Sequence, residues 1–137
     1  MKIKLGKNAK LPMSSPGNAC VDLFYNGEDT VIKSGQRMTL TTGISVEMPD
    51  DIVGLIWSRS GLAAKKGVCI LGGVIDPSYR GEIMVCILNT SDNDLEIKHH
   101  DRIAQMIFQN FWIPNFEICD ELSYTERGEN GFGSSGR

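Results

Sequence analysis

The regular spacing of short apolar segments is the feature that most constrains how this chain can fold. Many of these segments are β-branched or alternate in polarity, and turn formers such as Ser34-Gly35 and Pro49-Asp50 separate them. This pattern is typical of all-β sandwiches and barrels. The sequence therefore predicts strands within residues 2–5, 21–25, 30–33, 37–42, 43–48, 51–57, 82–89, 94–98, 102–111 and 116–119.

One segment has the pattern of a short helix instead. The run SGLAAKKG begins with Ser60, a residue suited to capping a helix, and ends on Gly67, a common helix stop. The run from Arg102 to Phe111 is compatible with helix or strand, but it is apolar and bounded, and we interpret it as a buried strand.

Composition limits the size and the partners. A chain of 137 residues is long enough for one domain with a real core. It has 14 basic and 17 acidic side chains and no basic stripe, so we expect no nucleic-acid partner. No secretory signal or membrane-spanning run appears, which predicts no membrane partner and a soluble, cytoplasmic or otherwise intracellular protein. The four cysteines form no C-x-x-C pair, so we expect free, mostly buried thiols.

The last eleven residues differ from the rest of the chain. Residues 127–137 are rich in glycine and serine and cannot pack a core, so we expect a flexible arm after a β domain that covers residues 1–126. Arg127 offers donors for phosphate, the serine hydroxyls can bind anionic oxygens, and Phe132 offers a flat face for a base. The segment is therefore either a lid for a nucleotide or a plain disordered terminus.

Two further runs contain candidate site residues. Arg59 and Ser60 stand just before the expected helix, where they would make a small phosphate site, or Ser60 would only cap the helix while Arg59 is solvated. Asp76 follows an apolar strand end and precedes Tyr79 by three residues, so both could face one cleft, with Asp76 as a general base. The alternative for Asp76 is an Asx turn.

The run HDRIAQMI places Asp101, Arg102 and Gln105 near the start of an apolar strand, where buried polar groups need partners. We expect a structural contact between Asp101 and Arg102. The neighbouring His99 and His100 have no third ligand at metal-binding spacing, and we expect surface histidines.

Together these runs resemble, in order, the five motifs of the homotrimeric dUTP pyrophosphatases (dUTPases). The five matching runs are ACVDL, SRSGLAAKKG, GVIDPSYRGE, DRIAQMI and RGENGFGSSG. The resemblance covers nearly the whole chain. It implies a jelly-roll-like (β-clip) subunit, a homotrimer with active sites shared between subunits, and hydrolysis of dUTP to dUMP and pyrophosphate. Such an activity limits uracil incorporation into DNA and supplies dUMP for thymidylate synthesis.

The resemblance also implies a role for each matching residue. Asp76 would activate the water that attacks the α-phosphorus, and Tyr79 would pack against the deoxyribose. Asp22 and Asp101 would support the site, and Mg²⁺ would be held by the triphosphate and water rather than by protein ligands. Backbone groups around Ile70 to Ile75 would read uracil. The residues expected to bind substrate are Arg59, Ser60, Gly61, Gly73, Val74, Ile75, Tyr79, Gln105, Arg127, Phe132, Gly133, Ser134 and Ser135.

Four positions depart from the family pattern. Cys20 and His100 stand where the family usually has glycine, and Ser58 stands where proline often precedes the arginine. Ile70 falls about where some members carry an asparagine that contacts uracil, so base recognition would depend more on the backbone. None of these changes removes a group that the chemistry needs.

Two other functions remain as alternatives. The dCTP deaminases share this fold and a similar serine-arginine run, but their catalytic glutamate aligns with Cys86, which cannot shuttle the protons of deamination. A nucleotide-binding regulatory module would lack the base or the arm, and this chain has both Asp76 and residues 127–137.

Overall fold

The computed structural model describes residues 1–131, and within them the chain forms eleven strands and one short helix. The prediction of an all-β, jelly-roll-like fold with one short helix is confirmed. The strands are β1 (Lys2–Leu5), β2 (Val21–Phe24), β3 (Thr30–Ile32), β4 (Arg37–Thr41), β5 (Ile44–Glu47), β6 (Ile52–Trp57), β7 (Val68–Leu71), β8 (Val74–Ile75), β9 (Met84–Asn89), β10 (Leu95–Ile97) and β11 (Arg102–Asn110), and the helix is α1 (Ser60–Lys66).

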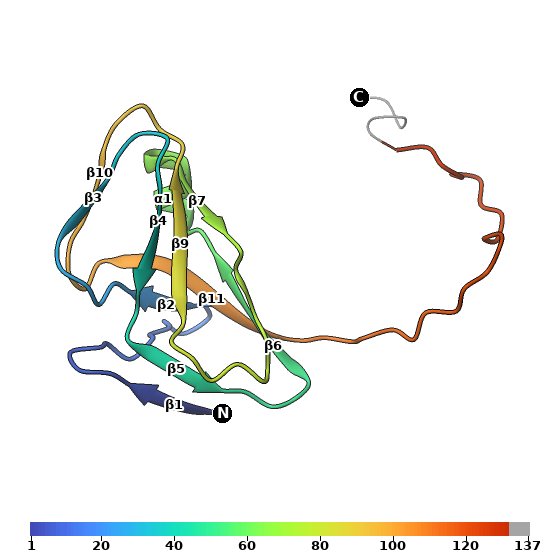
Figure 1. The fold of residues 1–137 in the computed structure, drawn as a ribbon, viewed down its shortest axis with the longest axis horizontal. Helices are drawn as coiled ribbons and strands as arrows, with labels where there is room; N and C mark the ends of the chain where they lie inside the picture. Colours follow the sequence, from blue (N-terminus) through green and yellow to red (C-terminus); the bar gives the residue numbers. More distant parts are fainter. Residues whose placement is uncertain (132–137) are drawn as a thin grey trace.

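The strands form two main sheets and two smaller ribbons. One sheet has the order β2-β11-β6-β8 and the other β4-β9-β7, while β1 pairs with β5 and β10 pairs with β3 (Figure 1). Alternate residues of the strands point inward, as Val85 and Ile87 of β9 do. The largest fully buried apolar side chains are Leu23, Ile32, Leu40, Ile44, Ile83, Val85, Ile87, Ile103 and Met106. Within residues 1–131, no helix has the length and apolar character that a membrane crossing requires.

Strand β11 departs from simple alternation at its start. Its pairing with β2 shifts register between Arg102 and Ala104, so that Arg102 lies opposite Phe24 and Ala104 opposite Leu23. This shift is a β-bulge, in which two residues of one strand face one residue of its partner. Ile103 and Ala104 are consequently both fully buried, with 0% of their surface exposed. The bulge brings Arg102 to the same face as Gln105, three residues along.

Helix α1 begins at Ser60, one residue earlier than a Ser60 cap would require. Arg59, not Ser60, is the N-cap residue, with an extended backbone and no side-chain capping hydrogen bond. The expectation that Ser60 caps the helix is therefore wrong, and its hydroxyl is not used in that way. At the other end Gly67 adopts φ 62° and donates its backbone N–H to Ala63 and Leu62, which ends the helix as predicted.

The turn between β7 and β8, which joins the two main sheets, depends on two glycines. Gly72 and Gly73 both have positive φ values, of 75° and 38°. The Gly73 carbonyl accepts a hydrogen bond of 2.7 Å from the Ile56 amide of β6, which fixes the turn against that strand. A Cβ atom at Gly73 would stand 2.6 Å from the Ile56 carbonyl oxygen. The turn therefore requires glycine at this position.

After β11 the chain leaves the body as one long extended segment (Figure 1). The predicted strand at 116–119 is not formed, because this segment has no neighbouring strand within residues 1–131. Phe116, Ile118 and Tyr124 are 89%, 99% and 91% exposed. The expectation of mostly buried cysteines is also wrong, since Cys69 and Cys119 are exposed, although all four thiols are free as expected.

We predict that Gly73→Ala lowers the free energy of unfolding by about 2 kcal/mol or more. The alanine would have to keep a backbone with positive φ, and its Cβ would collide with the Ile56 carbonyl oxygen. Thermal denaturation monitored by circular dichroism checks this. Gly61→Ala is the matched control, since nothing lies within 4 Å of a Cβ there and alanine favours the helix. Equal denaturation midpoints for the two variants would contradict this account of the turn between β7 and β8.

Candidate active site

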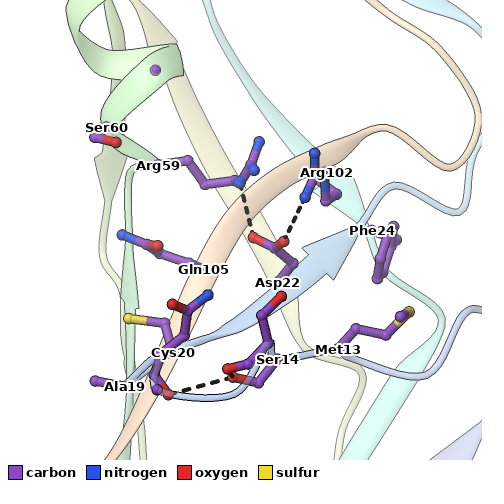
Figure 2. A pocket seen from close by; sticks show the side chains of 14 residues that line it. Met13, Ser14, Ala19, Cys20, Asp22, Phe24, Arg59, Ser60, Arg102 and Gln105 are labelled. Carbon is purple, nitrogen blue, oxygen red and sulfur yellow. Dashed lines mark hydrogen bonds and ion pairs between the residues drawn. The ribbon is translucent and has the colours of Figure 1, made fainter.

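A cavity with a volume of about 700 Å³ contains several of the expected site residues. It lies between β2, the loop before it, the turn that leads into α1, and the start of β11 (Figure 2). Five of the residues expected at the site line it: Asp22, Arg59, Ser60, Gly61 and Gln105. The fold thus brings together residues that are far apart in the sequence, since Asp22 and Gln105 are separated by 83 positions.

A carboxylate between two arginines organises this cavity. Arg59 Nε donates to Asp22 Oδ1 at 2.8 Å, and Arg102 Nη1 donates to Asp22 Oδ2 at 3.1 Å. Figure 2 shows the two guanidinium groups on either side of this one carboxylate. Because only the Nε edge of Arg59 is used, its terminal amino groups remain available to an anion. The alternative in which Arg59 is merely solvated is not supported, since its side chain is only 27% exposed.

Gln105 is held beside this ion pair by the sheet. It lies opposite Asp22 on β2 and opposite Trp57 on β6, in the middle of three paired strands. Its Nε2 donates to the Ser58 carbonyl at 3.1 Å, which fixes the amide next to the Arg59 turn. Ser60 is exposed at the rim of the same cavity. The cavity therefore offers guanidinium, hydroxyl and amide donors, a set suited to phosphate oxygens.

The residues of the third motif, Asp76 and Tyr79 among them, lie outside this cavity. Asp76 and Tyr79 are both exposed, and neither lines the cavity of Arg59. The Tyr79 amide donates to the Asp76 carbonyl and its hydroxyl to the Glu82 carbonyl, so this turn is closed by backbone groups rather than by an Asx side chain. Gly73 and Val74 line a separate cavity of about 320 Å³ beside Trp57. The residues expected to contact the uracil and the sugar therefore lie apart from the residues expected to contact the phosphates.

Asp101 does not make the predicted contact with Arg102. Its Oδ2 instead accepts the Lys98 amide at 2.8 Å, and its own amide donates to the Lys98 carbonyl at 2.9 Å. Arg102 turns away to Asp22 because of the bulge. Asp101 thus closes the turn before β11, in which His100 holds a left-handed φ of 68°. Its supporting role at the site stays a prediction.

The arm residues are described only in part. Arg127 is exposed, and its Nε donates to the Asn130 carbonyl at 3.0 Å within a local turn. Phe132, Gly133, Ser134 and Ser135 lie outside the described residues. Their roles, and the division of the chain at residue 126, stay predictions.

The side chains of this cavity suit a metal ion that is bound mainly by the phosphates of a substrate rather than by the protein. Its single carboxylate, Asp22, is already engaged by two arginines. Across residues 1–131 no three His, Cys, Asp or Glu side chains are grouped so as to hold a metal ion. Mg²⁺ often keeps waters and substrate phosphates as most of its ligands, which agrees with such a cavity.

Two groups in the cavity were missed by sequence reasoning. Arg102 was assigned to a structural contact, because strand alternation gives no sign of the bulge that turns it toward Asp22. The loop before β2 also contributes a wall, through Met13, Ser14, Ser15, Gly17 and Asn18. The polar run SSPGN directly before ACVDL was the available signal for that wall.

Comparison with known proteins gives a consistent result. The dUTPase family model matches residues 7–136. The chain is 43% identical over 134 residues to a deoxyuridine 5'-triphosphate nucleotidohydrolase of Paramecium bursaria Chlorella virus 1, covering 97% of this chain and 94% of that one. It is 41% identical over 141 residues to the protein of the same name from Clostridium tetani, covering 100% and 97%.

Solved structures agree with these relatives. The dUTPase of Staphylococcus bacteriophage 80alpha, solved with dUPNHPP, superposes with a TM-score of 0.90 at 31% identity, covering 99% of this chain and 98% of that one. The fold, the order of the motifs and the match over residues 7–136 therefore lead to one assignment. The chain belongs to the dUTPase family.

Proposed function

We propose that this protein hydrolyses dUTP to dUMP and pyrophosphate, and so keeps uracil out of DNA while supplying dUMP for thymidylate synthesis. The observation that carries the proposal is the 700 Å³ cavity in which Arg59, Arg102 and Gln105 gather around one carboxylate. Family membership and the dUTP analogue bound by the phage 80alpha enzyme support the same substrate.

The phosphate contacts follow from the donors of this cavity. Arg59, Ser60, Gly61 and Gln105 would bind the phosphate oxygens, with the guanidinium group offering a planar pair of N–H donors. Mg²⁺ would be held by the triphosphate and water, and when bound it would neutralise part of the phosphate charge. Asp22 would fix Arg59 rather than contact the reacting bond.

Asp76 would act as the general base. Its carboxylate would take a proton from a water molecule while the water oxygen bonds to the α-phosphorus and the bond to the bridging oxygen breaks, releasing pyrophosphate. Tyr79 would pack against the deoxyribose. Backbone groups of Gly73, Val74 and Ile75, in and after a turn that is hydrogen-bonded to Ile56, would read the uracil edge.

A homotrimer would join the two halves of the site. Asp76 and Tyr79 do not line the cavity of Arg59 in one copy of the chain, and in the proposed assembly a second copy would supply them. The extended segment after β11 supports such an assembly, because its apolar side chains, including Trp112 and Phe116, are 80% and 89% exposed. Apolar surface of this kind is normally covered by a partner. Arg127 and Phe132 to Ser135 would then close over the bound nucleotide as a lid.

We predict that the protein converts dUTP, and not dCTP, to its monophosphate in the presence of Mg²⁺. The measurement is chromatography of products after incubation with a panel of nucleoside triphosphates. Formation of dUTP from dCTP would instead favour a deaminase. A protein that binds dUTP but yields no product would favour a regulatory binding module.

We also predict that Asp76→Asn lowers kcat by about 100-fold or more, because the variant cannot accept the proton from water. Equilibrium binding of a nonhydrolysable dUTP analogue should change little, because the phosphate contacts remain. Asp92→Asn, an exposed aspartate in the turn after β9, is the matched control and should keep full activity. A fully active Asp76→Asn variant would refute the assignment of the base.

Two truncations separate the lid from the assembly. Ending the chain after Glu126 should lower turnover by about tenfold or more, through loss of the Arg127 contact and the groups that follow, while the trimer persists. Ending it after Asn110 should also dissociate the trimer, because the exposed apolar segment is lost. Light scattering and dUTP turnover give both readouts. Normal turnover without residues 127–137, or a trimer without residues 111–137, would contradict this division.

A further inference from the structure

Arg102 reaches the cavity only because of the bulge in β11. In a regular strand Arg102 would share a face with Ala104, which is fully buried, and Gln105 would share a face with Ile103. The register shift opposite Leu23 places Arg102 and Gln105 on one face instead. Bulges often serve to re-aim a side chain next to an active site.

The re-aimed arginine meets the carboxylate that holds Arg59. Asp22 Oδ1 accepts from Arg59 Nε at 2.8 Å and Oδ2 accepts from Arg102 Nη1 at 3.1 Å, so both oxygens of one carboxylate are engaged. Without Arg102, the Asp22 carboxylate could rotate, and the N–H edge that Arg59 presents to the cavity would rotate with it. The Asp22 backbone is itself fixed, since its amide donates to the Met13 carbonyl at 2.7 Å.

We propose that Arg102 is a positioning residue: it locks the Asp22 carboxylate and, through it, orients the terminal amino groups of Arg59 toward the phosphates. This inference rests on the proposed function. Stability alone does not explain the arrangement, because the Arg102 side chain is 54% exposed and an ion pair at such a site adds little to folding. The orientation of the Arg59 guanidinium group, in contrast, decides whether its N–H groups can reach the phosphate oxygens.

The test is the kinetics of Arg102→Gln in the full chain. We expect KM for dUTP, and the dissociation constant of a nonhydrolysable dUTP analogue, to rise about tenfold, the order expected when one charge-assisted hydrogen bond fails. We expect kcat to change less than KM, because Arg102 acts on binding rather than on proton transfer. Unchanged KM and dissociation constant would overturn the proposal.

A double-mutant cycle with Asp22→Asn decides how Arg102 acts. If Arg102 works through Asp22, then Arg102→Gln adds little to the loss already caused by Asp22→Asn. If Arg102 instead binds phosphate directly, the two losses multiply, and the positioning role is refuted. The dissociation constant of the analogue is the quantity to compare, since it does not depend on turnover.

Two more variants control for folding and charge. Arg102→Lys should restore binding to within about threefold of the wild type, because only one N–H of Arg102 is used on Asp22 and an ammonium can replace it. Failure of this rescue with a native melting temperature would count against the proposal. Arg37→Gln changes an exposed arginine at the start of β4 and should leave KM unchanged.

The wild-type protein separates this inference from the proposed function. A wild type that forms no dUMP would refute the function itself. An active wild type with an equally active Arg102→Gln variant would refute only the positioning role.

Discussion

The pairing of β11 with both β2 and β6 is the constraint on which the rest of this structure depends. This nine-residue strand lies between them in its sheet and carries two sets of residues at once. Ile103, Ala104 and Met106 fill the core, while Arg102 and Gln105 face the cavity. Core packing therefore fixes the register that places the cavity donors, because a slip of one residue would exchange the two faces.

Parts of the site that belong to different motifs are held in different ways. The cavity around Asp22 is built from charged and amide groups anchored on paired strands, with Asp22 shared by two arginines. The turn between β7 and β8 depends on backbone geometry, with two glycines at positive φ and one hydrogen bond from Ile56 to Gly73. Under the proposed function, paired strands would hold the anion contacts rigid, and base recognition would depend on the shape of that single turn.

Much of the fold was predictable, because alternation and turn residues are local signals. The strands from β1 to β6 and from β9 to β11 fall within the segments expected from the sequence. The convergence of Asp22, Arg59 and Gln105 was implied by the resemblance to the dUTPase motifs, and they do line one cavity. Arg102 was misassigned because a bulge is set by pairing with β2, which a single strand does not reveal. The segment at 116–119 has strand-like alternation but lacks a partner strand among residues 1–131.

The long exposed segment after β11 has a consequence for how activity would depend on the amount of protein. When one copy supplies the arginines and another supplies Asp76, catalysis follows the law of mass action for assembly as well as for substrate. Dilution below the dissociation constant of the assembly would then leave correctly folded subunits with no complete site. At protein concentrations below this constant, the activity per chain would fall even though each chain is intact.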